Sequence, residues 1–452
     1  MSGWHPRQEV FDRRAPAAAI AAAIAVAIAA LGTAAFASNG GGGREGSARM
    51  TVDLGQALAA GRDGKLTVGG LSDCRGRNFA LARYRGDGTL DHGFGTGGKV
   101  LTGFGAPSFA VATSLAIQRD GKIVAAGSAN VAPGVNSWFA IARYSATGKL
   151  DRTFGRNGKT VTYFGTRPQN NYSSAIAVAI QKDGKIVAAG RSSYWPIGGG
   201  TDFALARYTR QGRLDRSFGR GGKVVTDFGA RNNASANAVA IQPDGKIVAA
   251  GDRAERNFVL ARYNADGSLD RTFGQGGRVV TRVDRGHYAS ELVAQPDGRL
   301  VAAGAADRTS VALVRYGADG KLDPSFGDGG AVVTTAARGS GLAIQRDRKL
   351  VTVGTGSGRS GRGVFVLARF LEDGSFDQSF GQGGKLLTAF ARKAVANAVV
   401  VHPDGKIVVA GSVGGHDFAL ARYTGSGRLD GSFGSGGKVL TDFGSLCATR
   451  GR

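Results

Sequence analysis

The sequence predicts an all-β fold, a seven-bladed β-propeller of four-stranded antiparallel blades with about 55 residues each. Three phrases recur seven times in the same order along the 452 residues. They are Phe-Gly-x-x-Gly followed by a basic residue, Pro-Asp-Gly-Lys-Ile-Val-Ala-Ala-Gly, and Phe-Ala-Leu-Ala-Arg-Tyr, each with variants. A long repeat that is rich in β-forming segments is typical of propeller blades.

Each repeat contains four segments that favour strands. In residues 175–190, two β-rich runs flank Asp183-Gly184, which is a strong hairpin signal. A run such as KVVTDF precedes this hairpin and a run such as FALARY follows it. In the first hairpin strand, large residues such as Ile176 and Val178 alternate with alanines. Both faces are therefore apolar, which predicts sheets that are covered on both sides.

The two ends of the repeat array suggest how the ring closes. MTVDLG at 50–55, counted beside KVLTDFG at 438–444, would give eight copies of one strand and seven of the others. We predict that the C-terminal strand completes the first blade and closes the propeller. Two neighbouring repeats also lose consensus residues, in AVVTTAARG at 331–339 and RDRKL at 346–350. These departures predict a locally looser region.

The N-terminus predicts export from the cell. Basic residues precede an uncharged apolar stretch that ends in a small-x-small site, so residues 1–37 form a predicted signal peptide cleaved after Ala37. An uncleaved membrane anchor is the alternative, and Arg13-Arg14 permits twin-arginine export. Residues 38–48 are a predicted flexible Gly-rich linker, 49–444 the propeller and 445–452 a C-terminal tail. The expected location is secreted or at the cell surface, with no membrane span after cleavage.

The motifs DGSLDRTFGQGGRVVT, AVAIQPDGKIVAAG and NFVLARYNADG recur together and in order over roughly residues 49–444. With these motifs the chain resembles the bacterial delta-60 repeat family, a β-propeller domain of unknown function. The resemblance implies a β-propeller in a secreted or surface-associated bacterial protein. It supplies no established activity and no site residues.

Two motifs imitate ligand-binding loops. LDRTFGRNGKT at 150–160 resembles a phosphate loop, but Thr153 stands where that motif needs Gly, and a strand follows instead of a helix. DGSLD segments resemble calcium loops but lack the alternating ladder of oxygen ligands. We interpret both as turns and predict no metal and no cofactor.

A repeated arginine lies eight residues before a repeated aspartate, as in Arg262 and Asp270. A half-buried charge is costly unless it is paired. We predict a structural ion pair or an arginine-to-backbone bond in each blade, made by Arg83, Arg143, Arg207, Arg262, Arg315, Arg369 and Arg422.

The chain has two cysteines, Cys74 and Cys447. An oxidising compartment permits a disulfide between them. If the C-terminal strand joins the first blade, the two thiols come close and a disulfide would staple the ring. Two free thiols remain the alternative.

Insertions in the second and third repeats mark the candidate ligand site. Phe94, Phe154 and Phe218 begin successive Phe-Gly turns and are spaced more widely than the later copies. The extra residues fall in connections on one face of the propeller. The aromatic residues in these connections, which could stack on sugars or anchor a peptide, are Trp138, Tyr172, Tyr194 and Trp195. The alternative is that they only pin long loops to the blades.

The formal charge of +24 favours anionic partners such as envelope polymers, and glycans or proteins are further candidate partners. Nucleic acid is disfavoured because no compact basic motif accompanies the charge. The histidines show no metal-ligand spacing, and we identify no catalytic residues. The sequence favours a monomeric, non-enzymatic binding or scaffold propeller at the bacterial cell envelope. The alternative is a hydrolase or lyase acting on an envelope polymer or polysaccharide, with its site at the channel.

Overall fold

The computed structural model describes residues 52–447 apart from short gaps at 75–76, 106–108, 131–136, 166–170, 195–199, 230–232, 254–256, 284–287, 308, 336–337 and 359–360. The predicted signal peptide, its cleavage site after Ala37 and the linker lie outside the described residues, as do residues 448–452. Among the described helices, none is long and apolar enough to cross a membrane.

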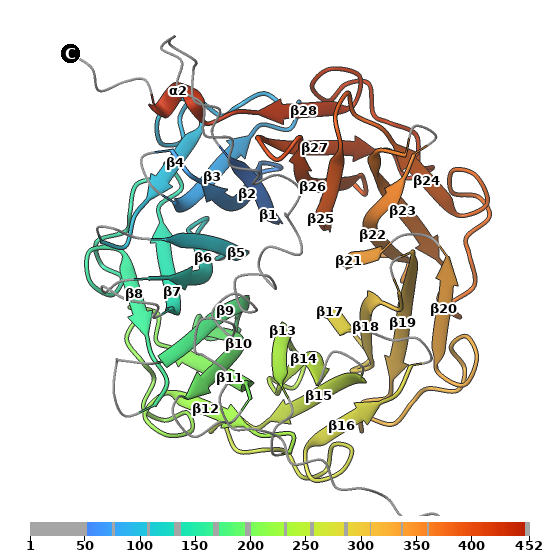
Figure 1. Cartoon of the computed structure of the whole chain (residues 1–452). Coiled ribbons are helices and arrows are strands. Elements are labelled where there is room, and N and C mark those ends of the chain that lie inside the picture. Colours follow the sequence, from blue (N-terminus) through green and yellow to red (C-terminus); the bar gives the residue numbers. More distant parts are fainter. Residues whose placement is uncertain are drawn as a thin grey trace, which may run out of the picture. The chain divides into compact units, whose positions relative to one another are not determined.

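The described part forms a seven-bladed β-propeller in which each blade is a four-stranded antiparallel sheet of four consecutive strands (Figure 1). The innermost strands are β1 (Asp53–Ala60), β5 (Ala110–Ile117), β9 (Asn171–Ile180), β13 (Ala234–Ile241), β17 (Tyr288–Ala294), β21 (Arg338–Ile344) and β25 (Ala394–Val401). The second strands are β2 (Leu66–Ser72), β6 (Ile123–Ala129), β10 (Ile186–Tyr194), β14 (Ile247–Arg253), β18 (Leu300–Ala305), β22 (Leu350–Ser357) and β26 (Ile407–Val413). The third strands are β3 (Asn78–Tyr84), β7 (Trp138–Tyr144), β11 (Asp202–Tyr208), β15 (Asn257–Tyr263), β19 (Ser310–Tyr316), β23 (Gly363–Phe370) and β27 (Asp417–Tyr423). The outermost strands are β4 (Lys99–Thr102), β8 (Lys159–Thr162), β12 (Lys223–Thr226), β16 (Arg278–Thr281), β20 (Ala331–Thr335), β24 (Lys385–Thr388) and β28 (Lys438–Thr441).

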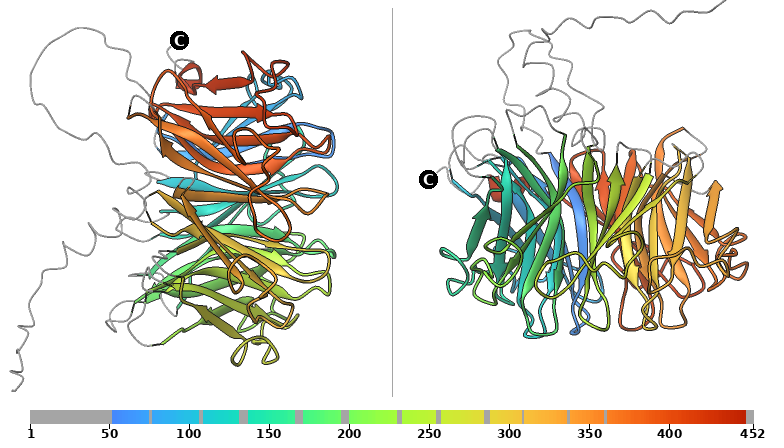
Figure 2. Two further views of the ribbon diagram at one scale, coloured as in Figure 1. Left: turned by 90° about the vertical axis from the view of Figure 1, so that its right-hand side faces the viewer. Right: turned by 90° about the horizontal axis from the view of Figure 1, so that it is seen from below.

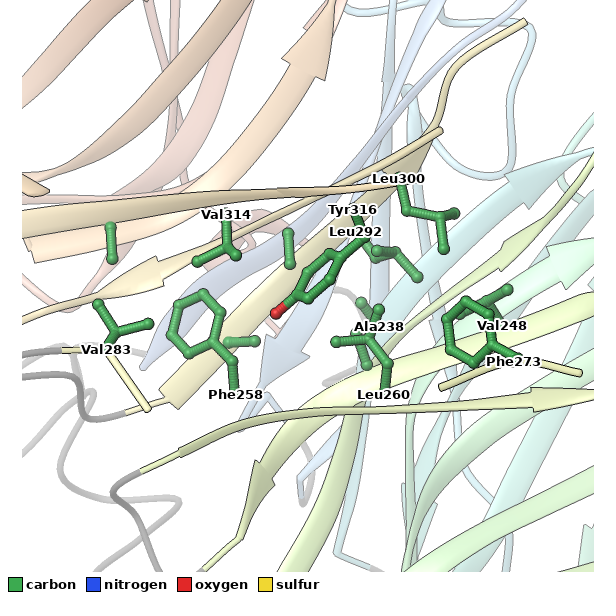
Figure 3. Close-up of a cluster of buried hydrophobic side chains, with 14 of the residues drawn as sticks. Ala238, Val248, Phe258, Leu260, Phe273, Val283, Leu292, Leu300, Val314 and Tyr316 are labelled. Carbon is green, nitrogen blue, oxygen red and sulfur yellow. The ribbon is translucent and has the colours of Figure 1, made fainter. Parts of the chain in front are cut away.

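The blades pack face to face around the axis, as Figure 2 shows from two sides. The core consists of apolar layers between neighbouring blades, because both faces of each sheet carry apolar side chains. In the layer between blades 4 and 5, Phe258 and Leu260 of β15 meet Val314 and Tyr316 of β19, all fully buried (Figure 3). The predicted all-β propeller with seven four-stranded blades is therefore confirmed.

The predicted closure by the C-terminal strand is wrong. β28 pairs with β27 of its own blade, with Phe418 opposite Thr441, and does not join blade 1. The turn between these two strands folds the chain back onto β27. Residues 53–60 form the innermost strand of blade 1. Blade 1 is thus complete without the C-terminus, and no eighth copy of any strand exists among the described residues.

Contacts between side chains and backbone close the ring instead. The Tyr84 hydroxyl donates to Thr441 Oγ1 at 2.8 Å, and the Phe443 amide donates to Asp53 Oδ2 at 2.9 Å. Beyond β28, the short helix α2 (Gly444–Cys447) brings Cys447 to Cys74, and the structure joins the two in a disulfide. The ring is closed by contacts of the kind that join other neighbouring blades, with a covalent link added.

A β-bulge interrupts the pairing of each innermost strand. In blade 4 the extra residue is Asn237, whose side-chain amide donates to the Ala289 carbonyl of blade 5 at 2.8 Å. Thr113, Ser340 and Asn397 bond the next innermost strand in the same way. Since a bulge leaves a backbone group unpaired, these side chains satisfy that group and tie the inner ring together.

The antiparallel order gives the propeller two distinct faces. We call the turn face the one that carries the Asp-Gly hairpins and the Phe-Gly turns. We call the loop face the one that carries the connections from second to third strands and from blade to blade. The insertions of blades 2 and 3 belong to the loop face, as predicted from the strand order.

Candidate functional site

The repeated arginines of the third strands lie buried on the turn face. Arg262 pairs with Asp270, with 2.8 Å between Nε and Oδ2, and its guanidinium stacks 4.5 Å from the centre of the Phe273 ring. Its Nη1 donates to the Ala318 carbonyl of the next blade. Burial alone raises the pKa of Asp270, but hydrogen bonds from Lys246 and from the adjacent threonine, with the arginine charge, hold this pKa well below its ordinary value.

This arrangement recurs in all seven blades, so the predicted ion pair is present. The pairs are Arg83–Asp91, Arg143–Asp151, Arg207–Asp215, Arg262–Asp270, Arg315–Asp323, Arg369–Asp377 and Arg422–Asp430. Each arginine also bonds a carbonyl in the following blade. The sequence did not predict this second contact, because the acceptor belongs to the next repeat and is distant in the chain. The most regular residues of the repeat therefore build the scaffold.

The segment at 150–160 that resembles a phosphate loop also makes contacts between blades. Lys159 Nζ donates to the Gly103 carbonyl of the preceding blade at 2.9 Å and lies 5.6 Å from the Phe104 ring centre. Thr160 Oγ1 donates to the Gly212 carbonyl at 2.8 Å. The two side chains that would hold phosphate and metal in a nucleotide site are thus used between blades. The interpretation of this segment as a turn agrees with the structure.

Two facing positions on the loop face differ from blade to blade. One position directly precedes the phenylalanine or valine of the third strand, and the other directly follows the paired threonine of the outermost strand. The strand registers make the two positions neighbours in each blade. In chain order the pairs are Asn78 and Gly103, Trp138 and Tyr163, Asp202 and Asp227, Asn257 and Arg282, Ser310 and Thr335, Val364 and Ala389, and Asp417 and Asp442.

Blade 2 places aromatic residues at this pair of positions. The rings of Trp138 and Tyr163 are 5.7 Å apart at an angle of 46°. Lys223 of blade 3 donates to the Tyr163 carbonyl at 3.2 Å, and its Nζ lies 5.3 Å from the Tyr163 ring centre. The neighbouring Ser137 pairs with Tyr172 across the junction between blades 2 and 3. We call Trp138, Tyr163 and Tyr172 the aromatic group.

Two features of the aromatic group bear on binding. Trp138 is half-buried, and its buried indole Nε1 has no hydrogen-bond partner among the described residues. Tyr172 is half-buried, and burial raises the pKa of its hydroxyl. An indole N–H normally finds an acceptor when it is buried. The group therefore combines aromatic surface with an indole donor that no described residue binds.

The structure brings together only part of the predicted ligand-binding set. Trp138 and Tyr172 lie at the same junction, but Trp195 and the side chain of Tyr194 lie outside what the structure describes. Sequence reasoning missed Tyr163. The signal was available, because this tyrosine directly follows Thr162, whose repeated counterparts pair with the third strands.

The same pair of positions in blade 3 is acidic. Burial and the nearby charge of Asp227 raise the pKa of Asp202 to about 6. Asp227 Oδ1 accepts a hydrogen bond from the Gly229 amide at 2.6 Å. The loop face thus changes from aromatic to acidic between neighbouring blades on an unchanged backbone. Across the described ranges, no group of three or more histidine, cysteine, aspartate or glutamate side chains could hold a metal ion.

One further acid lies on an innermost strand. Glu291 of β17 is half-buried, and burial raises the pKa of its carboxyl group to about 8. No hydrogen bond to this carboxyl group is present within the described part of the chain. Sequence reasoning did not identify Glu291, since nothing in its repeat shows which residues approach the axis.

Comparison with known proteins bears on family and fold. A family model described as "Domain of unknown function (DUF5122) beta-propeller" matches residues 61–94, 118–154, 181–218, 242–273, 295–326, 345–380 and 402–433, together just over half of the chain. No curated protein matches the sequence. Solved structures with a similar fold include a streptogramin B lyase, at 11% identity and a TM-score of 0.43 over 78% of this chain and 89% of the other.

Two other solved structures are similar at the same distant level. A glucose dehydrogenase matches at 14% identity and a TM-score of 0.37, over 82% of this chain and 97% of the other. A protein of unknown function from Dyadobacter fermentans matches at 11% identity and a TM-score of 0.38, over 84% of this chain and 92% of the other. Similarity this low carries no argument about activity. The seven matched repeats identify the chain as a member of the DUF5122 β-propeller family.

Proposed function

We propose that this protein is a secreted, non-enzymatic binding propeller at the bacterial cell envelope, with its ligand site on the loop face at the junction of blades 2 and 3. The aromatic group carries this proposal. The rings of Trp138 and Tyr163, both of blade 2, lie together there beside Lys223 of blade 3, and no described residue accepts a hydrogen bond from the Trp138 indole. Aromatic rings with a free donor can stack on a sugar ring and bond its hydroxyl groups.

The distribution of variable residues supports the same proposal. Repeated residues on the turn face and between blades are occupied by scaffold contacts, whereas the paired positions on the loop face change from aromatic to acidic to apolar. Binding sites commonly reside on variable segments that a rigid scaffold holds in place. The formal charge of +24 and the N-terminal sequence support an anionic polymer of the envelope as the ligand class.

A glycan array probed with the full secreted protein tests this function. We expect binding to envelope glycans that Trp138→Ala weakens at least tenfold, with Trp195→Ala testing the neighbouring loop. Tyr288→Ala is the matched control, because Tyr288 is a half-buried aromatic residue on an innermost strand of another blade. Equal binding by the wild type and Trp138→Ala would remove the aromatic group from the proposal.

Glu291 favours one alternative, a hydrolase or lyase with its site at the channel. A carboxyl group with a pKa of about 8 stays protonated at neutral pH and can act as a general acid. The same glycans, analysed for cleavage products, test this alternative. Turnover that Glu291→Gln abolishes would favour the enzyme, and binding without turnover would favour the binding propeller.

A further inference from the structure

The outermost strand of blade 4 differs from its counterparts in one side chain. Five outermost strands begin with a lysine that donates to a carbonyl of the preceding blade: Lys99, Lys159, Lys223, Lys385 and Lys438. Blade 4 has Arg278 at this position, and blade 5 has Ala331. Arg278 makes no such bond to any described residue, and its buried Nε has no partner among them. Among the described residues, the Arg278 cation thus takes no part in the contact between blades that the lysines make.

Arg278 lines a cavity of about 590 Å³ to which three successive blades contribute. Asp227 and Gly229 come from the end of blade 3, Gln275 and Val280 from blade 4, and Gly320 from the turn that follows β19 in blade 5. Val280 is 50% exposed. The volume lies within the range of pockets that hold small ligands or short polymer segments.

The chemistry of this cavity selects among anionic ligands. A guanidinium group presents a planar fork that binds a carboxylate through two parallel hydrogen bonds. Asp227 and Gln275 also line the cavity, and their side-chain oxygens can accept hydrogen bonds from hydroxyl groups. Val279 and Val280 offer an apolar surface to the C–H face of a sugar ring. Because a carboxylate already lines the cavity, a chain of phosphates with more closely spaced charge would meet stronger repulsion.

We propose that this cavity binds a carboxylated sugar unit of an acidic polysaccharide, with Arg278 holding the carboxylate. The inference rests on the proposed binding function and names its ligand class. It adds to the aromatic group a second contact point, lined by blades 3 to 5. An extended anionic polymer that reaches both sites would gain avidity from their combination. A neutral glycan would use the aromatic group alone.

Calorimetric titration of the full secreted protein with oligogalacturonate tests the proposal. We expect measurable binding that Arg278→Gln weakens at least tenfold. Arg278→Lys is the more discriminating variant, because it keeps the positive charge but removes the guanidinium group. It also restores the lysine that, in five other blades, donates to a carbonyl of the preceding blade. We expect Arg278→Lys to fold at least as stably as the wild type and to lose at least fivefold in affinity.

Controls separate this site from general electrostatics and from the proposed function. Lys438→Gln removes an equal charge from blade 7 and should change the affinity less than twofold. Methyl-esterified oligogalacturonate should bind at least tenfold more weakly than the acid, and polyphosphate should not compete at equal charge. Unchanged binding by Arg278→Gln or effective competition by polyphosphate would overturn the assignment. If Trp138→Ala weakens glycan binding while Arg278→Gln does not, the binding function stands and this inference fails.

Discussion

The junction between blades 7 and 1 and the junction between blades 5 and 6 solve the same packing problem with different contacts. At both, an arginine of one blade bonds a carbonyl of the next: Arg422 bonds Gly86, and Arg315 bonds Glu372. At the first junction Tyr84 also bonds Thr441, and a disulfide joins the two blades. The disulfide therefore reinforces the place where the chain ends meet.

The junction between blades 5 and 6 lacks several of these contacts. Phe370 stands where the other third strands end in a tyrosine that bonds the preceding blade, and its ring stacks on Phe376 at 4.8 Å. Blade 5 has Val311 at the position where five of the other blades have a phenylalanine that pairs with a second one. Arg348, at a φ of 64°, replaces the hairpin glycine of blade 6. The repeats that depart from the consensus sequence are thus the ones with fewer contacts between blades 5 and 6.

Replacing an arginine of the repeated ion pairs should lower the free energy of unfolding more than any other change. Arg315→Met leaves the Asp323 carboxylate in a site built for a pair, so we expect a loss of about 3–5 kcal/mol in the free energy of unfolding. Arg262→Met should lose a similar amount. Chemical denaturation followed by circular dichroism measures both.

Hydrogen exchange distinguishes the two arginine variants. Arg315→Met should expose the amides of blades 5 and 6 first, because fewer other contacts hold this junction. Uniform exchange across all blades in both variants would contradict the idea of a weaker junction. Neither variant should change binding at the aromatic group, since both arginines lie on the turn face and the aromatic group lies on the loop face.

Breaking the covalent closure tests the opposite junction. Cys74→Ser combined with Cys447→Ser should lower the free energy of unfolding by about 2–4 kcal/mol, because the bond joins positions separated by 373 residues. The wild type in reducing buffer should show the same loss. A thiol assay that finds two free thiols in the native secreted protein would show that the covalent closure does not form.

Ionisation of Glu291 should weaken blade 5 as the pH rises. Its ordinary pKa is 4.5 and burial raises it to about 8, so the folded protein holds this proton more tightly than the unfolded chain. Stability contributed by the protonated acid is complete below pH 4.5 and falls as the pH rises to about 8. Glu291→Gln should therefore stabilise the protein by up to about 4 kcal/mol at pH 8 and by little at pH 4.5. Thermal melts of both proteins across this range provide the test, and a difference that is independent of pH would contradict it.

The repeated contacts were predictable from the sequence, but the choice of closing partner was not. Arg262 and Asp270 could be paired because their spacing recurs seven times on adjoining segments. KVLTDFG at 438–444 has the composition of an outermost strand whichever blade it joins, and the turn geometry decides its partner. Asn237 reads as an ordinary strand residue, because only the register reveals the bulge. Tyr163 directly follows β8 (Lys159–Thr162), and it was missed because only the register between β7 and β8 makes it a neighbour of Trp138.

Restoring the missing tyrosine should strengthen the weaker junction by a smaller amount. In the six other blades the hydroxyl of this tyrosine bonds the threonine of the preceding outermost strand, with distances of 2.7–2.9 Å. The threonine at the matching position of blade 5 is Thr334, opposite Val311. Phe370→Tyr should therefore add one buried hydrogen bond and raise the free energy of unfolding by about 1 kcal/mol.

Tyr423→Phe is the matched opposite change, because it removes the bond between the Tyr423 hydroxyl and Thr388 Oγ1 between blades 6 and 7. Its loss should be at least as large as the gain from Phe370→Tyr, since the Thr388 hydroxyl is left buried without its partner. If Phe370→Tyr instead lowers the melting temperature, the stacking of Phe370 on Phe376 already occupies the space that the hydroxyl needs. The junction between blades 5 and 6 would then be packed around its phenylalanine pair, and its difference from the closure would lie in the kind of contact rather than in its strength.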